Sequence, residues 1–248
     1  MRESALTILD IIKDLKNHLA GQDIYTVVPA EDHCLAQENN NSEDITHIID
    51  KKTLLDELRK ELEDCYSCGL SRHRIKPVID SGNPNSDIML IGDFPGKKDM
   101  NLGKAFSSEA GLLLDKMLKA ISLDREHVYI TNILKCHIPN DRVPRPEEAK
   151  TCLPVLEKQI EIINPKLILA LGNVTGKLLL NTDESFEKMR KKNFTHEHYS
   201  INIKEKNIPV FITYHPAELI LNSALKKPSW EDMKVFLTTY KKMGLYVH

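Results

Sequence analysis

The stretch Tyr129-Ile130-Thr131-Asn132-Ile133-Leu134-Lys135-Cys136 decides how the rest of the chain is interpreted. It begins as an apolar, β-branched run, which predicts a buried strand, and it continues into a polar Thr-Asn pair. A loop with proline and arginine then leads to a helix that carries a second cysteine, Cys152. If Cys136 and Cys152 bind one metal group, the strand end that presents Asn132 is tied to that group.

Short apolar runs alternate with longer amphipathic segments on both sides of this strand. The apolar runs predict strands at residues 88–91, 128–133, 167–171 and 210–214. Amphipathic helices are expected to follow them, beginning near Ser108, Pro146, Gly172 and Pro228. This alternation predicts an α/β fold with three α/β/α layers around a central four-stranded parallel sheet.

The amino-terminal part of the chain has a different character. Residues 4–20 carry leucine and isoleucine at helical spacing, which predicts a helix that packs on the main domain or on a partner. Residues 31–47 are polar and acidic, as in a linker, and residues 52–63 return to a helical pattern that leads to Cys65. We therefore divide the chain into residues 1–50, an N-terminal helix and polar linker, and residues 51–248, one α/β domain.

Composition limits the kind of protein this is. The 248 residues are 41% hydrophobic and 28% charged, which is typical of a soluble globular protein. The net charge of −2 gives no overall attraction to nucleic acid, so any DNA contact must come from local basic groups. No signal peptide or membrane span is visible, and we expect a cytoplasmic monomer without a membrane partner.

Cysteine spacing predicts a metal site. In a cytoplasmic chain disulfides are disfavoured, and the Cys65-Tyr-Ser-Cys68 pattern indicates metal or redox chemistry. Cys136 and Cys152 can complete a four-thiolate site, which suits either zinc or an iron–sulfur cluster. Cys34 stands in the acidic linker and is interpreted as a free thiol.

Polar side chains follow several of the predicted strands. Because ligands of a parallel sheet bind at the carboxyl ends of its strands, the residues at these ends are the candidates for a site. They bring a carboxylate, a carboxamide and an imidazole to one edge, from Asp93, Asn132 and His215. Each of these residues, taken alone, is as well explained as a cap or turn residue.

The chemistry of these groups fits a pyrimidine base. The carboxamide of Asn132 can accept from N3–H and donate to O4 of uracil, a pattern that cytosine reverses, provided that the amide is held in one orientation. His215 can donate to O2 as negative charge builds on a departing base. Phe106 can stack on a base that has been flipped out of DNA, although a core aromatic beneath the loop explains it equally well.

Several linked motifs resemble the bacterial and archaeal iron–sulfur uracil-DNA glycosylases, known as family 4 of the uracil-DNA glycosylase superfamily. The resemblance covers about residues 52–241. Its motifs here are Gly92-Asp-Phe-Pro-Gly96 with Asp99 and Gly103-Lys-Ala-Phe106, Thr131-Asn-Ile-Leu-Lys-Cys136, Pro146 to Cys152, and His215-Pro-Ala-Glu-Leu219 with Lys226 and Trp230-Glu-Asp-Met-Lys234. Their common order along the chain makes the resemblance specific.

The resemblance implies a DNA-repair enzyme that hydrolyses the N-glycosidic bond of uracil in single- or double-stranded DNA. It implies a structural [4Fe-4S] cluster on Cys65, Cys68, Cys136 and Cys152. The catalytic residues that it implies are Asp93 and His215. The substrate-binding residues would be Asp93, Phe94, Gly96, Asp99, Phe106, Asn132 and His215, and the DNA-binding residues Arg142, Arg145, Leu221 and Lys226.

Four positions depart from the family pattern. Asp93 stands where the family has glutamate, Phe94 where it has alanine or glycine, Asp141 where it more often has asparagine, and Leu221 where it often has arginine. A shorter carboxylate and a larger neighbour can weaken catalysis or reshape the pocket. Two alternatives therefore stay open: an inactive relative that binds DNA as an accessory module, and a glycosylase for another deaminated base.

Overall fold

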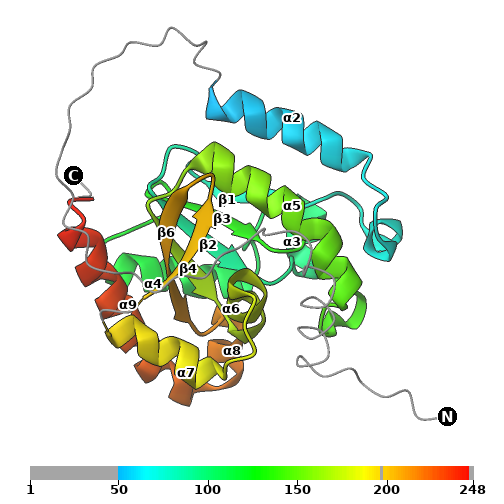
Figure 1. Ribbon diagram of the computed structural model, residues 1–248. Helices are drawn as coiled ribbons and strands as arrows, with labels where there is room; N and C mark the ends of the chain where they lie inside the picture. The colour runs from blue at the N-terminus through cyan, green and yellow to red at the C-terminus, as the bar shows by residue number, and fades with distance from the viewer. Residues whose placement is uncertain (1–49, 196–197, 246–248) are drawn as a thin grey trace, which may run out of the picture.

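The computed structural model describes residues 50–195 and 198–245, which form a mixed α/β domain around one six-stranded sheet (Figure 1). The strand order is β1-β3-β2-β4-β6-β5. The strands are β1 (Asp80–Gly82), β2 (Ile88–Gly92), β3 (Val128–Asn132), β4 (Leu167–Leu171), β5 (Tyr199–Ile203) and β6 (Lys206–Thr213). The predicted α/β class is confirmed.

The four predicted strands form the parallel centre of this sheet. β2 pairs in parallel with β3 and with β4, and β4 pairs in parallel with β6. Every residue of β2, β3 and β4 is buried, as expected for strands covered on both faces. The carboxyl ends of these strands consequently lie along one edge, where the sequence placed the candidate site.

The prediction of a purely parallel, four-stranded sheet is wrong at both edges. β1 adds antiparallel to β3, and β5 adds antiparallel to β6. β1 has only three residues and no apolar pattern. The β5–β6 hairpin turns at Lys204 and Glu205, both of which have positive φ. Asparagine or glycine normally marks such a turn, and neither is present here.

Helices cover both faces of the sheet (Figure 1). One core cluster joins the sheet to α2, α5, α6 and α7, and a second joins the opposite face to α3, α4 and α9. Figure 1 shows α2, in blue, alongside α5 at the outside of the first layer. The helices are α2 (Lys51–Glu63), α3 (Lys97–Leu102), α4 (Glu109–Ala120), α5 (Pro146–Ile163), α6 (Asn173–Leu180), α7 (Phe186–Lys191), α8 (Pro216–Leu221) and α9 (Lys226–Lys242).

Short 3-10 turns join several of these elements. They are η1 (Gly69–His73), η2 (Pro139–Asp141), η3 (Lys192–Phe194) and η4 (Ser223–Leu225). The predicted helix at residues 4–20, the linker at 31–47 and Cys34 lie outside the described residues. Within the described part of the chain, no helix is both long enough and apolar enough to span a membrane.

Candidate active site and cysteine site

The Asn132 side chain, at the end of β3, is buried without a hydrogen-bond partner. The residue is 1% exposed, and neither Oδ1 nor Nδ2 has a partner in the structure. Gly92, its neighbour on β2, has no room for a side chain, because a Cβ there would lie 2.5 Å from Asn132 Oδ1. Since buried polar groups are normally paired, the amide has unused hydrogen-bonding capacity at the sheet edge.

Asp93 follows β2, and its carboxylate is held from the start of α6. Thr175 donates to Oδ1 from its hydroxyl group and, at 3.3 Å, from its main-chain N–H. Gly172, with φ of +98°, lets the chain pass close to this group, because a Cβ there would lie 3.4 Å from Asp93 Oδ1 and 3.1 Å from His215 Cβ. Asp93 and His215 therefore both lie next to the position that a side chain at Gly172 would occupy.

His215 is the N-cap of α8, and this position fixes the role of its ring. The ring Nδ1 accepts the main-chain N–H of Ala217 at 3.2 Å, so in the neutral ring the proton lies on Nε2. Glu218 accepts the main-chain N–H of His215 at 3.2 Å and completes the cap. The ring can consequently donate one hydrogen bond from Nε2, as the sequence prediction requires.

Phe106 lies beneath this edge in a strained backbone conformation. It is 3% exposed, its φ is 51°, and its ring centroid is 5.5 Å from that of His215. Its ring would also touch a Cβ at Gly92, so it borders the space in front of Asn132. Arg125 donates to the carbonyl oxygens of Phe106 and Ala105, which holds this turn in place.

Asp99 holds the loop that links β2 to Phe106. Its Oδ2 accepts the N–H of Gly96 at 3.1 Å, and its Oδ1 accepts the N–H of Ser107 at 2.6 Å. The carboxylate is buried and closes the first turn of α3 as a capping residue. In this geometry Asp99 and Gly96 shape the loop, and a direct contact with substrate stays a prediction for both.

Phe94 faces the cysteine-bearing segments. It packs on the small apolar cluster of Leu70, Leu134, Cys136 and Ile138, to which Cys68 and Cys152 also contribute. His137 Nδ1 lies 3.0 Å from the carbonyl oxygen of Pro95, which ties the same loop to the strand-end segment. The benzyl group that departs from the family pattern therefore has a packing role next to the cysteines.

Four free thiols gather where three segments meet. Cys65 and Cys68 lie between α2 and η1, Cys136 lies after β3, and Cys152 lies on α5. Burial raises the pKa of Cys136, and Cys65 and Cys68 lie close enough that their negative charges raise it further. The charges of Cys136 and Cys68 act on Cys152 in the same way. Among the described residues, no three metal-binding side chains are close enough to hold a single metal ion.

Two cations flank these thiols. Arg74 lies 3.4 Å from Cys136 Sγ through Nη1 and also interacts with Cys65, while its Nη2 donates to the last carbonyls of α2. Lys135 interacts with Cys152. Burial raises the pKa of Cys152 to about 11, and the charge and main-chain N–H of Lys135 oppose that rise. An all-sulfur donor set beside two cations fits an anionic iron–sulfur cluster.

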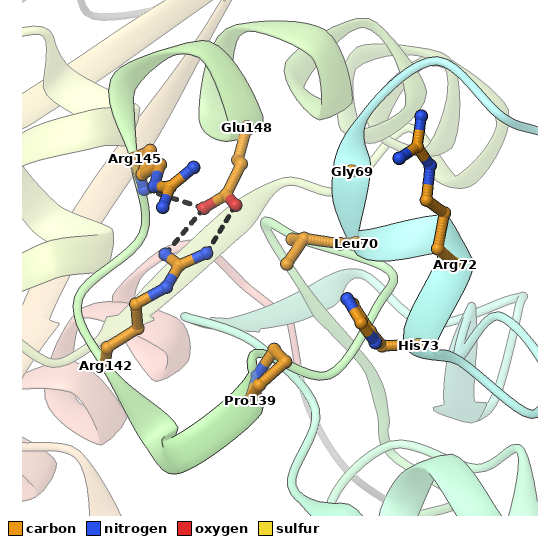
Figure 2. Close-up of a pocket in the computed structure, with 8 residues that line it drawn as sticks. All are labelled: Gly69, Leu70, Arg72, His73, Pro139, Arg142, Arg145 and Glu148. Atoms are coloured by element: carbon orange, nitrogen blue, oxygen red, sulfur yellow. Dashed lines mark hydrogen bonds and ion pairs between the residues drawn. The ribbon is translucent and has the colours of Figure 1, made fainter.

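The predicted DNA-binding residues come from two segments of the chain, the start of α5 and the junction of α8 with α9. Arg142 forms a bidentate ion pair with Glu148, at 2.9 and 2.6 Å, and Arg145 caps α5 beside it. Figure 2 shows this pair facing η1 across a pocket of about 240 Å³. Leu221 ends α8 with 89% of its surface exposed, and the exposed Lys226 begins α9.

Three residues near the site were not found from the sequence. Thr175 holds Asp93, Arg125 holds the Phe106 turn, and Glu218 caps α8 beside His215. Burial raises the pKa of Glu218, and the charge of Asp93 adds to this shift, while the interactions with His215 oppose it. The helix start at Gly172-Asn-Val-Thr175 was the available signal for Thr175; Arg125 and Glu218 had none beyond their charge.

Comparison with known proteins identifies the class to which this architecture belongs. The family model of the uracil DNA glycosylase superfamily matches residues 79–234. The chain belongs to this superfamily.

Curated relatives narrow the comparison further. The chain is 38% identical over 185 residues to the type-4 uracil-DNA glycosylase of Sulfurisphaera tokodaii, covering 73% of this chain and 82% of the relative. It is 34% identical to that of Archaeoglobus fulgidus, covering 73% and 90%, and 32% identical to that of Thermotoga maritima, covering 78% and 98%. These relatives confirm the resemblance to the family 4 enzymes.

Proposed function

We propose that this protein is a uracil-DNA glycosylase that hydrolyses the N-glycosidic bond of uracil in DNA and leaves an abasic site. The observation that carries the proposal is the buried, unpartnered carboxamide of Asn132 at the sheet edge. A buried amide without partners costs about 1–3 kcal/mol, so its presence is explained if a ligand completes it. The type-4 relatives support the same activity.

Base recognition would divide between the hydrogen-bonding edge and one face of the pyrimidine. Asn132 would pair with N3–H and O4, and its backbone, held in β3, would limit how the amide can turn. Phe106 would offer its ring to the base plane beside His215. A buried polar group left unpaired by cytosine would make the discrimination strong.

Bond cleavage would use Asp93 and His215 on opposite sides of the glycosidic bond. Both contacts from Thr175 fall on Oδ1 of Asp93, so Oδ2 keeps its lone pairs for a water molecule or the sugar. The Nε2–H of His215 would donate to uracil O2 as the base gains negative charge. The sugar becomes oxocarbenium-like in the same step, and the Asp93 carboxylate would stabilise that positive charge.

DNA contacts would come from these two segments of the chain. The 89% exposed Leu221 is suited to enter the stack as an apolar wedge, with Lys226 near a phosphate. Arg145 lines the pocket of Figure 2 together with Arg72 and His73, a set of side chains suited to a phosphate. Arg142 would act partly through its pairing with Glu148, which orders the loop.

A [4Fe-4S] cluster on Cys65, Cys68, Cys136 and Cys152 is the cofactor that we propose. The cluster would brace the loops that carry Arg142 and Arg145 rather than take part in hydrolysis. The all-thiol set and the cations Arg74 and Lys135 support this choice, although zinc also accepts four thiolates. A cytoplasmic monomer and the domain division at residue 50 stay predictions.

A direct assay tests the function. Protein purified without oxygen is analysed for iron and sulfide. It is then incubated with single- and double-stranded oligonucleotides that contain uracil, hypoxanthine or xanthine, with thymine or cytosine at the same position as controls. Strand cleavage by alkali at uracil alone is the expected result. DNA binding with a full cluster and no cleavage at uracil would instead identify the accessory module, and cleavage at hypoxanthine or xanthine alone the other alternative.

A second assay tests the residue roles. The variants Asn132→Ala and His215→Ala should each lower the excision rate by orders of magnitude while iron and sulfide contents stay at the wild-type level. If both variants remain fully active, the proposed site is wrong even though the activity is present.

A further inference from the structure

Lys135 is a fully buried lysine between the candidate base site and the cysteines. Only 1% of its surface is exposed. Its ammonium group donates to the hydroxyl of Thr131 at 2.9 Å and, at shorter range, to the main-chain carbonyl of Asn132. The lysine therefore holds the peptide group of the residue whose side chain has no partner.

The carbonyl of Asn132 matters because no hydrogen bond holds its side-chain amide. Neither polar atom of that side chain has a hydrogen bond in the structure. The direction of the amide is then set by its own backbone and by packing against Gly92 and Phe106. An anchor on the Asn132 carbonyl consequently limits the rotation of the peptide that carries the amide.

Lys135 also ends a buried chain of hydrogen bonds that begins at the surface. From Lys135 the chain runs through Thr131 to Gln159 at 3.1 Å, from Gln159 to the hydroxyl of Tyr129 at 2.7 Å, and from Tyr129 to Asp80 at 2.8 Å. Arg59 of α2 closes it with a bidentate pair to Asp80, at 2.8 and 2.7 Å. Such a network gives the ammonium group one position.

The charge of Lys135 lacks a close carboxylate. Among residues 50–195 and 198–245, no acidic side chain forms an ion pair with it, and the charges that attract it are those of Cys152 and Asp80. The main-chain N–H of Lys135 also donates a hydrogen bond to Cys152, so the two residues are in direct contact. A buried cation normally requires a compensating anion, and thiolates at the cysteine site provide one.

We propose that Lys135 is a positioning residue that acts on both sites: its ammonium group anchors the carbonyl of Asn132 and balances the negative charge of the thiolate-bound cluster on the Cys152 side. Arg74 is the corresponding cation at Cys65 and Cys136. It is only half-buried, so its charge is screened by solvent more than that of Lys135. The inference rests on the proposed function, because it concerns the same amide and the same cysteines.

Two variants of Lys135 test the proposal. Lys135→Met keeps the length but removes the charge and the donors; Lys135→Gln removes the charge and keeps a shorter donor. The matched control is Lys119→Met, which makes the same change at an exposed lysine of α4. The readouts are the midpoint potential of the cluster and the single-turnover rate and KM for uracil excision.

The two roles predict different shifts. Loss of a nearby cation should move the midpoint potential to more negative values in both variants, because the reduced, more negative cluster is then less stabilised. Loss of the anchor should lower the single-turnover rate of Lys135→Met about 10- to 100-fold with KM unchanged, and that of Lys135→Gln less. Lys119→Met should match the wild type in every readout.

Each readout can overturn one half of the proposal. An unchanged potential in Lys135→Met with a full cluster overturns the charge role, and an unchanged rate overturns the anchoring role. If neither lysine variant folds, Thr131→Val removes the neighbouring acceptor while the ammonium stays, and an unchanged rate there overturns the anchoring role. If the wild type itself releases no uracil, the proposed function fails, while the potential still tests the charge role.

Discussion

Two regions along the same edge of the sheet, the ends of β3 and β6, differ in whether their buried polar groups are paired. At the end of β3, the amide of Asn132 has no partner. At the end of β6, the hydroxyl of Thr213 contacts Asp232 at 2.8 Å and Ser229 at 3.1 Å, and Asp232 forms a bidentate pair with Arg190 at 2.8 and 3.0 Å. The paired cluster serves the fold, and the unpaired amide is available to a ligand.

The difference has an energetic reason. A buried charge that keeps its partner is tolerated, but the same charge alone costs several kcal/mol, so the Arg190–Asp232 cluster must stay complete. An unpaired neutral amide costs only about 1–3 kcal/mol, which a domain can tolerate at one position if binding recovers it. The following predictions separate the two regions, from the largest expected effect to the smallest.

The variant Asp232→Ala should break the paired region. Arg190, whose side chain is 9% exposed, would lose its buried carboxylate partner. We expect the free energy of unfolding to fall by about 3–5 kcal/mol. Denaturant unfolding measures the change. Excision per folded molecule should stay close to the wild type; a large loss there would place Asp232 in the active site.

The variant Asn132→Ala should break the unpaired region. We expect excision to fall about 10²- to 10³-fold, because contacts made to a developing charge and base edge are lost. Stability should not fall, since no hydrogen bond is removed and the cost of the unpaired amide is lost with it. The matched control is Asn193→Ala, because Asn193 is buried but paired with the N–H and the carbonyl of Ile212 at 3.1 and 2.6 Å.

Asn193→Ala should therefore show the reverse pattern. It should cost about 1–3 kcal/mol of stability and leave the excision rate per folded molecule unchanged. Equal stability losses in the two asparagine variants would contradict the assignment of a free amide at position 132.

The variant Leu221→Ala tests the exposed surface next to these regions. Loss of the wedge should lower excision from double-stranded DNA about 10-fold, because the vacated stack is then filled less well. Excision from single-stranded DNA should change less, since no base stack needs filling. The ratio of the two rates is the measurement, and an unchanged ratio would remove the wedge role.

The variant Glu148→Gln should give the smallest effect, and one that depends on pH. Burial alone would raise the pKa of Glu148, but hydrogen bonds from Arg142 and the Arg145 N–H lower it below the ordinary 4.5. A carboxyl group with a lowered folded pKa stabilises above its unfolded pKa, and that stability is lost as pH falls through the folded value. The free energy of unfolding of the wild type should thus exceed that of the variant at pH 7. The difference should be only about 1 kcal/mol, because the ion pair is partly exposed to water.

The expected pH profile can be checked by thermal unfolding. The difference in stability between the wild type and Glu148→Gln should shrink as pH falls below 4.5, because the Glu148 carboxylate is then protonated and becomes neutral like glutamine. A difference that stays constant with pH would show that packing, not the Arg142 pair, is responsible.

Much of the fold followed from local pattern, and the misses have specific causes. The four buried strands were predicted because parallel strands covered on both faces are continuous apolar runs. β1 was missed because three polar or small residues carry no pattern, and β5 because its turn uses Lys204 and Glu205. The roles of Thr175 and Arg125 depend on contacts between segments more than 15 residues apart.

The sequence by itself determined the α/β class, the four central strands and the strand ends where Asp93, Asn132 and His215 stand. Periodicity and position along a parallel sheet are enough for that, because strand ends of one sheet share an edge. Only the tertiary structure decided which of these polar groups is paired. In the folded protein the amide of Asn132 has no hydrogen-bond partner, and Asp93 accepts a hydrogen bond from Thr175. Phe94 packs on the cysteine-bearing cluster, and the buried Lys135 donates to the carbonyl of Asn132. Pairing depends on distances between distant segments, and no local pattern encodes them.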